Sequence, residues 1–158
     1  MQAAFASGEL PPVQFETRRY LSAPPAVVFA LISDNATLPT PEPGPGRVQA
    51  DEARSTLPRG AGTRRTLDPL MGIAGTEGVV AFEPPFGLSY SATDESLRGL
   101  LTAHVSELQC AAYGEGTELS WTVRGRLARS WWKRLLARLL FARALRSGVK
   151  DLERRLAT

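Results

Sequence analysis

The chain has 158 residues and a mass of 17.1 kDa, which is the usual size of one domain. Hydrophobic residues make up 43% and charged residues 22%, so a wholly disordered chain is excluded. There is no apolar run near the ~20 residues of a membrane-spanning helix, and the first residues lack the pattern of a secretory signal. One cysteine, Cys110, and one histidine, His104, cannot form a disulfide or a Cys/His zinc site. We therefore expect a cytoplasmic protein without metal or cofactor.

The net charge of +3 conceals two segments of opposite sign. Residues 1–123 hold 8 Lys or Arg and 14 Asp or Glu, a net charge of −6, whereas residues 124–158 hold 11 and 2, a net charge of +9. The pI near 9.5 is thus a property of the terminal segment. Such a segment either meets an anionic partner or is the solvated face of a helix.

The first part of the chain predicts a leader, a strand, a short helix and a loop. Residues 1–12 are predicted to be a flexible leader, and the alternation of Val13–Ser22 predicts a strand. Pro24 and Pro25 then open a short helix that ends near Asp34, because proline is tolerated in a first helical turn. Residues 36–46 hold four prolines and two glycines and are predicted to be a loop.

Six more strands follow, separated by short turns that contain Gly or Pro. They are predicted at Arg47–Arg54, Thr63–Leu67, Thr76–Glu83, Gly87–Thr93, Leu100–Ala112 and Thr117–Arg126. Strands so close in sequence form an antiparallel meander.

The last 30 residues change to a helical period. The apolar positions are Trp132, Leu135, Leu139, Ala142, Leu145, Val149, Leu152 and Leu156. The order of elements predicts an α+β fold, in which a curved seven-stranded antiparallel sheet wraps around a long C-terminal helix. Residues 13–158 would form this single domain, and a bent sheet around a straight helix often leaves a cavity.

Several segments resemble the START-like, Bet v 1-like (SRPBCC) superfamily, and within it the polyketide cyclase/dehydrase-like group. The similar segments are YLSAPPAVVFALISD, GAGTRR from Gly60, VVAFEPPFGLSYS after Glu77, HVSEL from His104 and GTELSWTVR from Gly116. The resemblance implies a helix-grip fold with a central hydrophobic pocket. It implies no single reaction, because members include cyclases, aromatases and lipid carriers.

The turns predict which side chains face that pocket. The apolar side chains of the last strand, Trp121 among them, are expected to point inward. If Ala112 pairs with Thr117, the residues that lie opposite these side chains on the neighbouring strand point inward as well. These partners are Cys110, Leu108, Ser106 and, by continuation, His104. If Glu83 pairs with Phe86, the pairs Ala81–Leu88, Val79–Tyr90 and Glu77–Ala92 follow, and Glu77 also points inward.

Either Arg64 or Arg65 is expected in this group, since the two lie on opposite faces of their strand. A carboxylate and an arginine inside the sheet would have to pair, because a lone buried charge is costly.

The candidate catalytic residues are His104 and Glu77, which could transfer protons in an aldol-type cyclisation or a dehydration. Each also has a plain structural interpretation, His104 as a core histidine and Glu77 as the partner of an arginine. The candidate ligand-binding residues are Tyr90, Trp121, Leu88, Ser106, Arg64, Arg65 and Leu139.

The sequence and the resemblance together favour a protein that binds a hydrophobic small molecule. The alternative is a non-catalytic lipid or quinone carrier or sensor that docks on an anionic membrane through its basic helix. Nucleic acid is not an expected partner, because no base-stacking or base-reading residues can be placed. The expected oligomeric state is a monomer or a homodimer.

Overall fold

The computed structural model describes residues 10–34, 48–70, 73–92 and 97–157. Seven strands form one sheet in the order β1-β7-β6-β5-β4-β3-β2, and every pair of neighbouring strands is antiparallel. The elements are β1 (Val13–Leu21), α1 (Pro25–Ser33), β2 (Val48–Asp51), β3 (Arg64–Leu70), β4 (Ile73–Glu83), β5 (Gly87–Ala92), β6 (Leu101–Tyr113), β7 (Gly116–Leu127) and α2 (Trp131–Leu156). This is the helix-grip fold that the sequence predicts.

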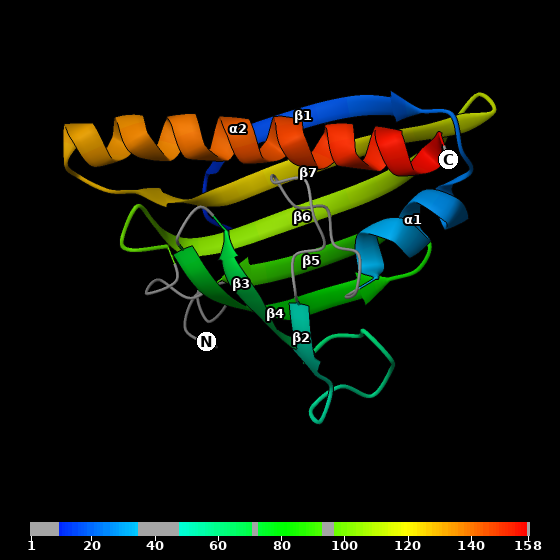
Figure 1. Cartoon of the computed structure of the whole chain (residues 1–158), viewed down its shortest axis with the longest axis horizontal. Coiled ribbons are helices and arrows are strands. Elements are labelled where there is room, and N and C mark those ends of the chain that lie inside the picture. Colours follow the sequence, from blue (N-terminus) through cyan, green and yellow to red (C-terminus); the bar gives the residue numbers. More distant parts are fainter. Residues whose placement is uncertain (1–9, 35–47, 71–72, 93–96, 158) are drawn as a thin grey trace.

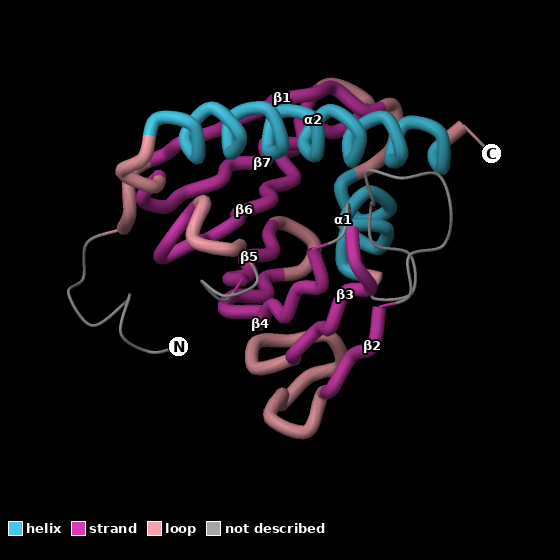
Figure 2. Tube along the Cα trace, turned by 60° about the vertical axis from the view of Figure 1, so that its left-hand side comes forward, coloured by secondary structure: helices cyan, strands magenta, loops and turns pink. Residues whose placement is uncertain are grey.

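The sheet curves around α2, which runs the length of the molecule beside β1 and β7 (Figure 1). The far edge, formed by β3 and β2, bends away from the helix, and α1 lies near the C-terminal end of α2 (Figure 2). The predicted elements agree with the observed ones to within a few residues. Residues 1–9 of the predicted leader and the predicted loop at 36–46 lie outside the described residues.

The predicted register between β6 and β7 is confirmed. Ala112 pairs with Thr117, Cys110 with Leu119, Leu108 with Trp121 and Ser106 with Val123. The tight turn at Tyr113–Gly116 sets this register, because a short hairpin loop leaves few alternative pairings.

The predicted register between β4 and β5 is wrong at the turn and right beyond it. The Phe86 amide donates to the Glu83 carbonyl at 2.7 Å, which holds Phe86 in the turn and makes Gly87 the partner of Glu83. Ala81 consequently pairs with Ser89 rather than with Leu88. A bulge between Val79 and Ala81 adds one residue to β4. The predicted pairs Val79–Tyr90 and Glu77–Ala92 are thereby restored.

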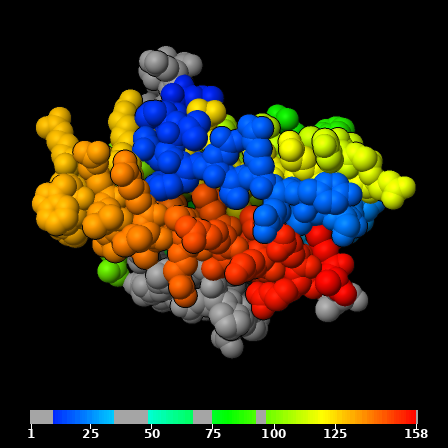
Figure 3. Space-filling model, turned by 90° about the horizontal axis from the view of Figure 1, so that it is seen from above, coloured from blue at the N-terminus to red at the C-terminus, as the bar shows by residue number. Residues whose placement is uncertain are grey.

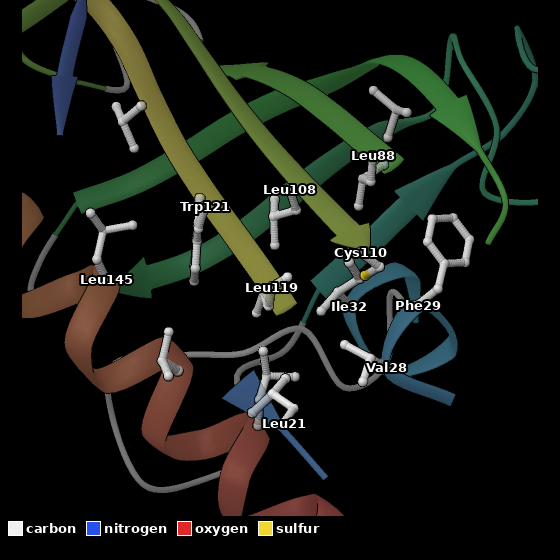
Figure 4. Close-up of a cluster of buried hydrophobic side chains, with 14 of the residues drawn as sticks. Leu21, Val28, Phe29, Ile32, Leu88, Leu108, Cys110, Leu119, Trp121 and Leu145 are labelled. Carbon is white, nitrogen blue, oxygen red and sulfur yellow. The ribbon is translucent and has the colours of Figure 1, made fainter. Parts of the chain in front are cut away.

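The core lies between the inner face of the sheet and the two helices. Side chains of β5, β6 and β7 meet those of α1 and the second half of α2 (Figure 4). The labelled side chains in this view are Leu21, Val28, Phe29, Ile32, Leu88, Leu108, Cys110, Leu119, Trp121 and Leu145. Their burial supplies the main favourable free energy of folding, as in other globular domains.

Only the second half of the predicted apolar row of α2 reaches this core. Leu145, Val149 and Leu152 are buried, whereas Leu139 is 62% exposed and does not line the interior as predicted. The apolar positions recur about every 3.4 residues, but an α-helix turns once in about 3.6, so the row drifts around the helix. The drift carries the start of the row to the outer face.

Candidate functional site

A group of polar side chains is buried on the inner face of the sheet, among the apolar core residues. Arg65 on β3, Glu77 on β4, and His104 and Ser106 on β6 are each at least 94% buried. Tyr90 on β5 is partly buried, and Trp121 on β7 is buried. Neighbouring strands thus bring together side chains that lie far apart in sequence.

Arg65 and Glu77 form a buried ion pair, with 2.7 Å between Arg65 Nη2 and Glu77 Oε1. The two residues are directly cross-strand. Burial raises the pKa of Glu77, and the Arg65 charge acts in the opposite direction. The alternative left open by the sequence is therefore decided: Arg65 is the inward residue of the pair, and Arg64 is exposed.

Several buried donors of this group are left without an aligned acceptor among the described residues. Arg65 Nε and Nη2 and Trp121 Nε1 make no hydrogen bond. The contact between Arg65 Nη2 and Glu77 is therefore a charge contact rather than an aligned hydrogen bond. A buried donor without an acceptor costs about 1–3 kcal/mol, so such groups call for an explanation.

Tyr90 lies at the centre of these donors. The Arg65 guanidinium carbon lies 5.0 Å from the centre of the Tyr90 ring, a cation–π contact. Burial raises the pKa of the Tyr90 hydroxyl, while hydrogen bonding to Ser106 and Trp121 lowers it. The Trp121 N–H is thus within reach of the Tyr90 oxygen, although it is not well aligned with it.

His104 is held as a neutral imidazole. Its Nδ1 accepts a hydrogen bond from the Ala92 amide at 2.9 Å, and its Nε2 lies 3.0 Å from Ser106 Oγ. Burial lowers the pKa of His104 to about 4. Because Nδ1 accepts, the proton of the neutral ring must be on Nε2, and Nε2 must donate to Ser106.

Ala103 and His104 form a β-bulge in β6. Thr102 pairs with Arg126 and Val105 with Arg124, so two residues of β6 oppose the single residue Gly125. Ala103 adopts a positive φ of 51° at this point. Bulges re-aim side chains, and His104 here contacts the rings of Tyr90 and Phe141.

The hydrogen-bond directions form a chain that ends at Tyr90. Since Ser106 Oγ accepts from His104 Nε2, the Ser106 proton can be donated to the Tyr90 oxygen. In that arrangement Ser106 is a donor to the Tyr90 oxygen, while the Trp121 N–H lies near this oxygen without an aligned hydrogen bond.

The structure thus brings together Arg65, Glu77, Tyr90, His104, Ser106 and Trp121. Leu88 is buried in the adjoining core, whereas Arg64 and Leu139 lie outside the group. Sequence reasoning missed Phe141 of α2, which stacks on Phe15 at 5.1 Å between ring centres and lies 6.2 Å from the His104 ring. The sequence shows that Phe141 belongs to the apolar side of the helix together with Leu140. Whether its ring faces the sheet depends on how the helix is rotated on the sheet.

Other parts of the chain offer less chemistry. Burial raises the pKa of the Cys110 thiol to about 11, so this residue is a poor nucleophile. Two hollows in the described part, of about 330 and 390 Å³, lie over β2–β4 and over β4–β6. Neither is lined by Glu77, Tyr90 or His104, and the central pocket stays a prediction.

Within the described residues, neither helix has the length and apolar character needed to cross a bilayer. A search among curated proteins finds no match.

Solved structures share the fold over nearly the whole chain. The crystal structure of Ara h 8.0201 is 15% identical with a TM-score of 0.71, and the match covers 92% of this chain and 99% of that one. A solution structure of a protein from Thermobifida fusca is 18% identical with a TM-score of 0.69, covering 90% and 91%. XoxI from Bacillus cereus is 18% identical with a TM-score of 0.66, covering 90% and 94%.

The family model described as polyketide cyclase/dehydrase and lipid transport matches residues 12–157. With the seven-stranded sheet gripping α2 and the structural likeness to Ara h 8.0201, this match shows that the chain belongs to that family, within the Bet v 1-like (SRPBCC) superfamily.

Proposed function

We propose that the protein binds an apolar small molecule that carries an acceptor oxygen, such as a carbonyl, and that this oxygen is bound beside Tyr90. The observation that carries the proposal is the cluster of buried donors without an aligned acceptor at Arg65 and Trp121. A ligand oxygen would satisfy them, and the surrounding leucine and aromatic side chains would contact the apolar remainder.

The same arrangement supports proton chemistry without a cofactor. In the catalytic form of the proposal, the Glu77 carboxylate removes a proton from the carbon beside a carbonyl. The electron pair moves onto the carbonyl oxygen, where Tyr90 and Arg65 stabilise the enolate. The enolate carbon attacks a second carbonyl of the same molecule, a C–C bond forms, and Glu77 returns the proton to the new alkoxide. Loss of water would complete a dehydration.

Of the two candidate catalytic residues, Glu77 is favoured as the base. His104 has its basic nitrogen engaged by the Ala92 amide, and its lowered pKa of about 4 makes it a weak base. Its proposed part is to position Ser106 and, through Ser106, the Tyr90 hydroxyl. The raised pKa of Glu77 makes its ionised form a stronger base.

The binding proposal is tested with two probes of equal size, acetylnaphthalene, which has a carbonyl, and ethylnaphthalene, which has none. We expect the native protein to bind acetylnaphthalene more tightly, by up to about tenfold, because one hydrogen bond contributes about 1 kcal/mol net. Tyr90→Phe removes one of the donors beside the ligand oxygen and keeps the ring, so it should reduce this preference, while Arg65 and Trp121 retain part of it. Calorimetric titration gives both dissociation constants.

Tyr113→Phe is the matched control, because Tyr113 is 64% exposed and lies at the β6–β7 turn. This variant should keep the preference of the native protein. Equal affinity of the native protein for both probes, or a preference that Tyr90→Phe leaves unchanged, would contradict the proposed site. Native mass spectrometry of the protein purified from cells would identify a retained ligand.

A carrier or sensor for a lipid or quinone is the second candidate, and the exposed start of α2 favours it. The candidates differ in what Glu77 does. In an enzyme, Glu77→Gln, assayed under conditions where circular dichroism shows it to be folded, would abolish turnover while ligand affinity stays within a few-fold. In a carrier, affinity would instead follow the apolar wall, for example Leu88 and Trp121.

A further inference from the structure

The first half of α2 presents large apolar side chains to solvent. Trp131 is 75% exposed and Leu139 62%, and Trp132, Leu135 and Leu136 are exposed as well. We name these five residues the exposed helix patch. Single exposed apolar residues are common, but five within nine residues of one helix mark an interaction surface.

The patch lies at one end of the molecule. In Figure 3 the start of α2, drawn in orange, forms that end, while its continuation in red packs beside β1. The exposed patch is therefore the outer part of a helix whose other face is fixed on the sheet. Because the helix is already packed on the sheet, the patch needs no additional folding before it can contact a partner.

Exposed cations lie along the same segment of the chain as the patch, and among the described residues they have no acidic partners. Arg129, Arg134, Arg138 and Arg143 are exposed, and no carboxylate of the described residues pairs with any of them. Residues 124–150 contain no Asp or Glu at all. Lys133 lies over the Trp132 ring, with 5.6 Å between Nζ and the ring centre. The surface thus combines tryptophan, leucine and uncompensated positive charge.

We propose that the exposed helix patch docks the protein on an anionic lipid surface. Tryptophan and leucine enter the interface between headgroups and acyl chains, and arginine pairs with anionic headgroups. An anionic lipid surface can therefore interact both with the apolar side chains and with the positive charges of this region. This inference deepens the carrier candidate given above, which supplies a biological reason for docking. The docking itself is measured independently of ligand binding in the pocket.

Other occupants fit less well. A second copy of the chain on the same patch would bring two unpaired basic rims together, which opposes association. Nucleic acid would pair with the arginines but would leave the leucines in water. An anionic membrane satisfies the charges and buries the apolar side chains.

The test is cosedimentation with vesicles of phosphatidylcholine mixed with phosphatidylglycerol, compared with vesicles of phosphatidylcholine alone. We expect retention on the anionic vesicles at low salt, weaker retention as salt is raised, and little on the neutral ones. Trp131 and Trp132 should also shift their fluorescence to shorter wavelength on binding, because they leave water.

Two pairs of variants separate the contributions. Trp132→Ser with Leu139→Ser should abolish retention, whereas Leu57→Ser with Phe86→Ser removes two equally exposed apolar residues elsewhere and should not. Arg134→Gln with Arg138→Gln should weaken partitioning at least about tenfold. Arg54→Gln with Arg59→Gln, two exposed arginines of another surface, is the charge control.

Failure of anionic vesicles to retain the native protein at low salt would overturn the proposal. So would retention that survives the Trp132 and Leu139 replacements, or a dimer in sedimentation velocity that those replacements dissociate. All these side chains are exposed, so each variant should have the same melting temperature as the native protein. A docking failure with the acetylnaphthalene preference intact would refute this surface alone, and the reverse result would refute the pocket alone.

Discussion

Replacing Arg65 by methionine is expected to destabilise the protein by about 3–5 kcal/mol, because Glu77 would be left buried without its counter-ion. Glu77→Gln should have a similar effect, since Arg65 is 1% exposed and would lose its only buried anionic contact among the described residues. Either loss is a large fraction of the 5–15 kcal/mol typical of a whole domain. Chemical denaturation followed by circular dichroism gives the free energies of unfolding.

The double variant distinguishes an ion pair from two independent residues. Arg65→Met with Glu77→Leu removes both charges and should be more stable than either single variant, because no uncompensated charge remains. Arg124→Met is the control, since its pair with Glu107 is partly exposed and should contribute much less. Additive losses in the double variant would show that Arg65 and Glu77 are not coupled.

Acidification below pH 6.5 is expected to destabilise the protein through His104. The imidazole pKa is 6.5 in an unfolded chain and about 4 when buried, so the unfolded state binds more protons between these values. The stabilisation is complete above pH 6.5 and is lost as the pH falls toward 4. The loss should reach about 2 kcal/mol at pH 5 and about 3 kcal/mol at pH 4.

Comparison with His104→Gln isolates this effect. The raised pKa of Glu77 acts with the opposite sign, because its folded form retains a proton that the unfolded form releases as the pH rises. Both proteins contain Glu77, so its contribution largely cancels in the difference between their unfolding free energies. That difference should change with pH below 6.5. A difference that is constant from pH 7 to pH 4 would mean that His104 keeps its ordinary pKa in the folded state.

Much of the site could be predicted from local pattern. Leu119, Trp121 and Val123 alternate on one face of their strand, and the short turn before them sets the pairing with Ser106 and Cys110. Alternation in strands has a period of two residues, so one reliable turn determines which side of each strand faces inward. The need to pair a buried carboxylate with an arginine follows from the cost of desolvating charge.

Other features were decided only in three dimensions. Arg65 rather than Arg64 joins the site because Arg65 lies directly across from Glu77. The pairing of Val79 with Tyr90 depends on a β-bulge that cannot be predicted from the residue types. The His104 tautomer depends on the amide of Ala92.

Local patterns in the sequence were enough to predict the order of strands and helices, the inward face of the sheet and the concentration of positive charge in the last segment. The arginine that meets Glu77 and the half of α2 that stays in solvent could be identified only from the packing of distant segments. The physical reason is the range of the interactions. Alternation and turn chemistry act between near neighbours in sequence, whereas charge pairing, bulges and the rotation of a helix on a sheet are settled by contacts between distant segments.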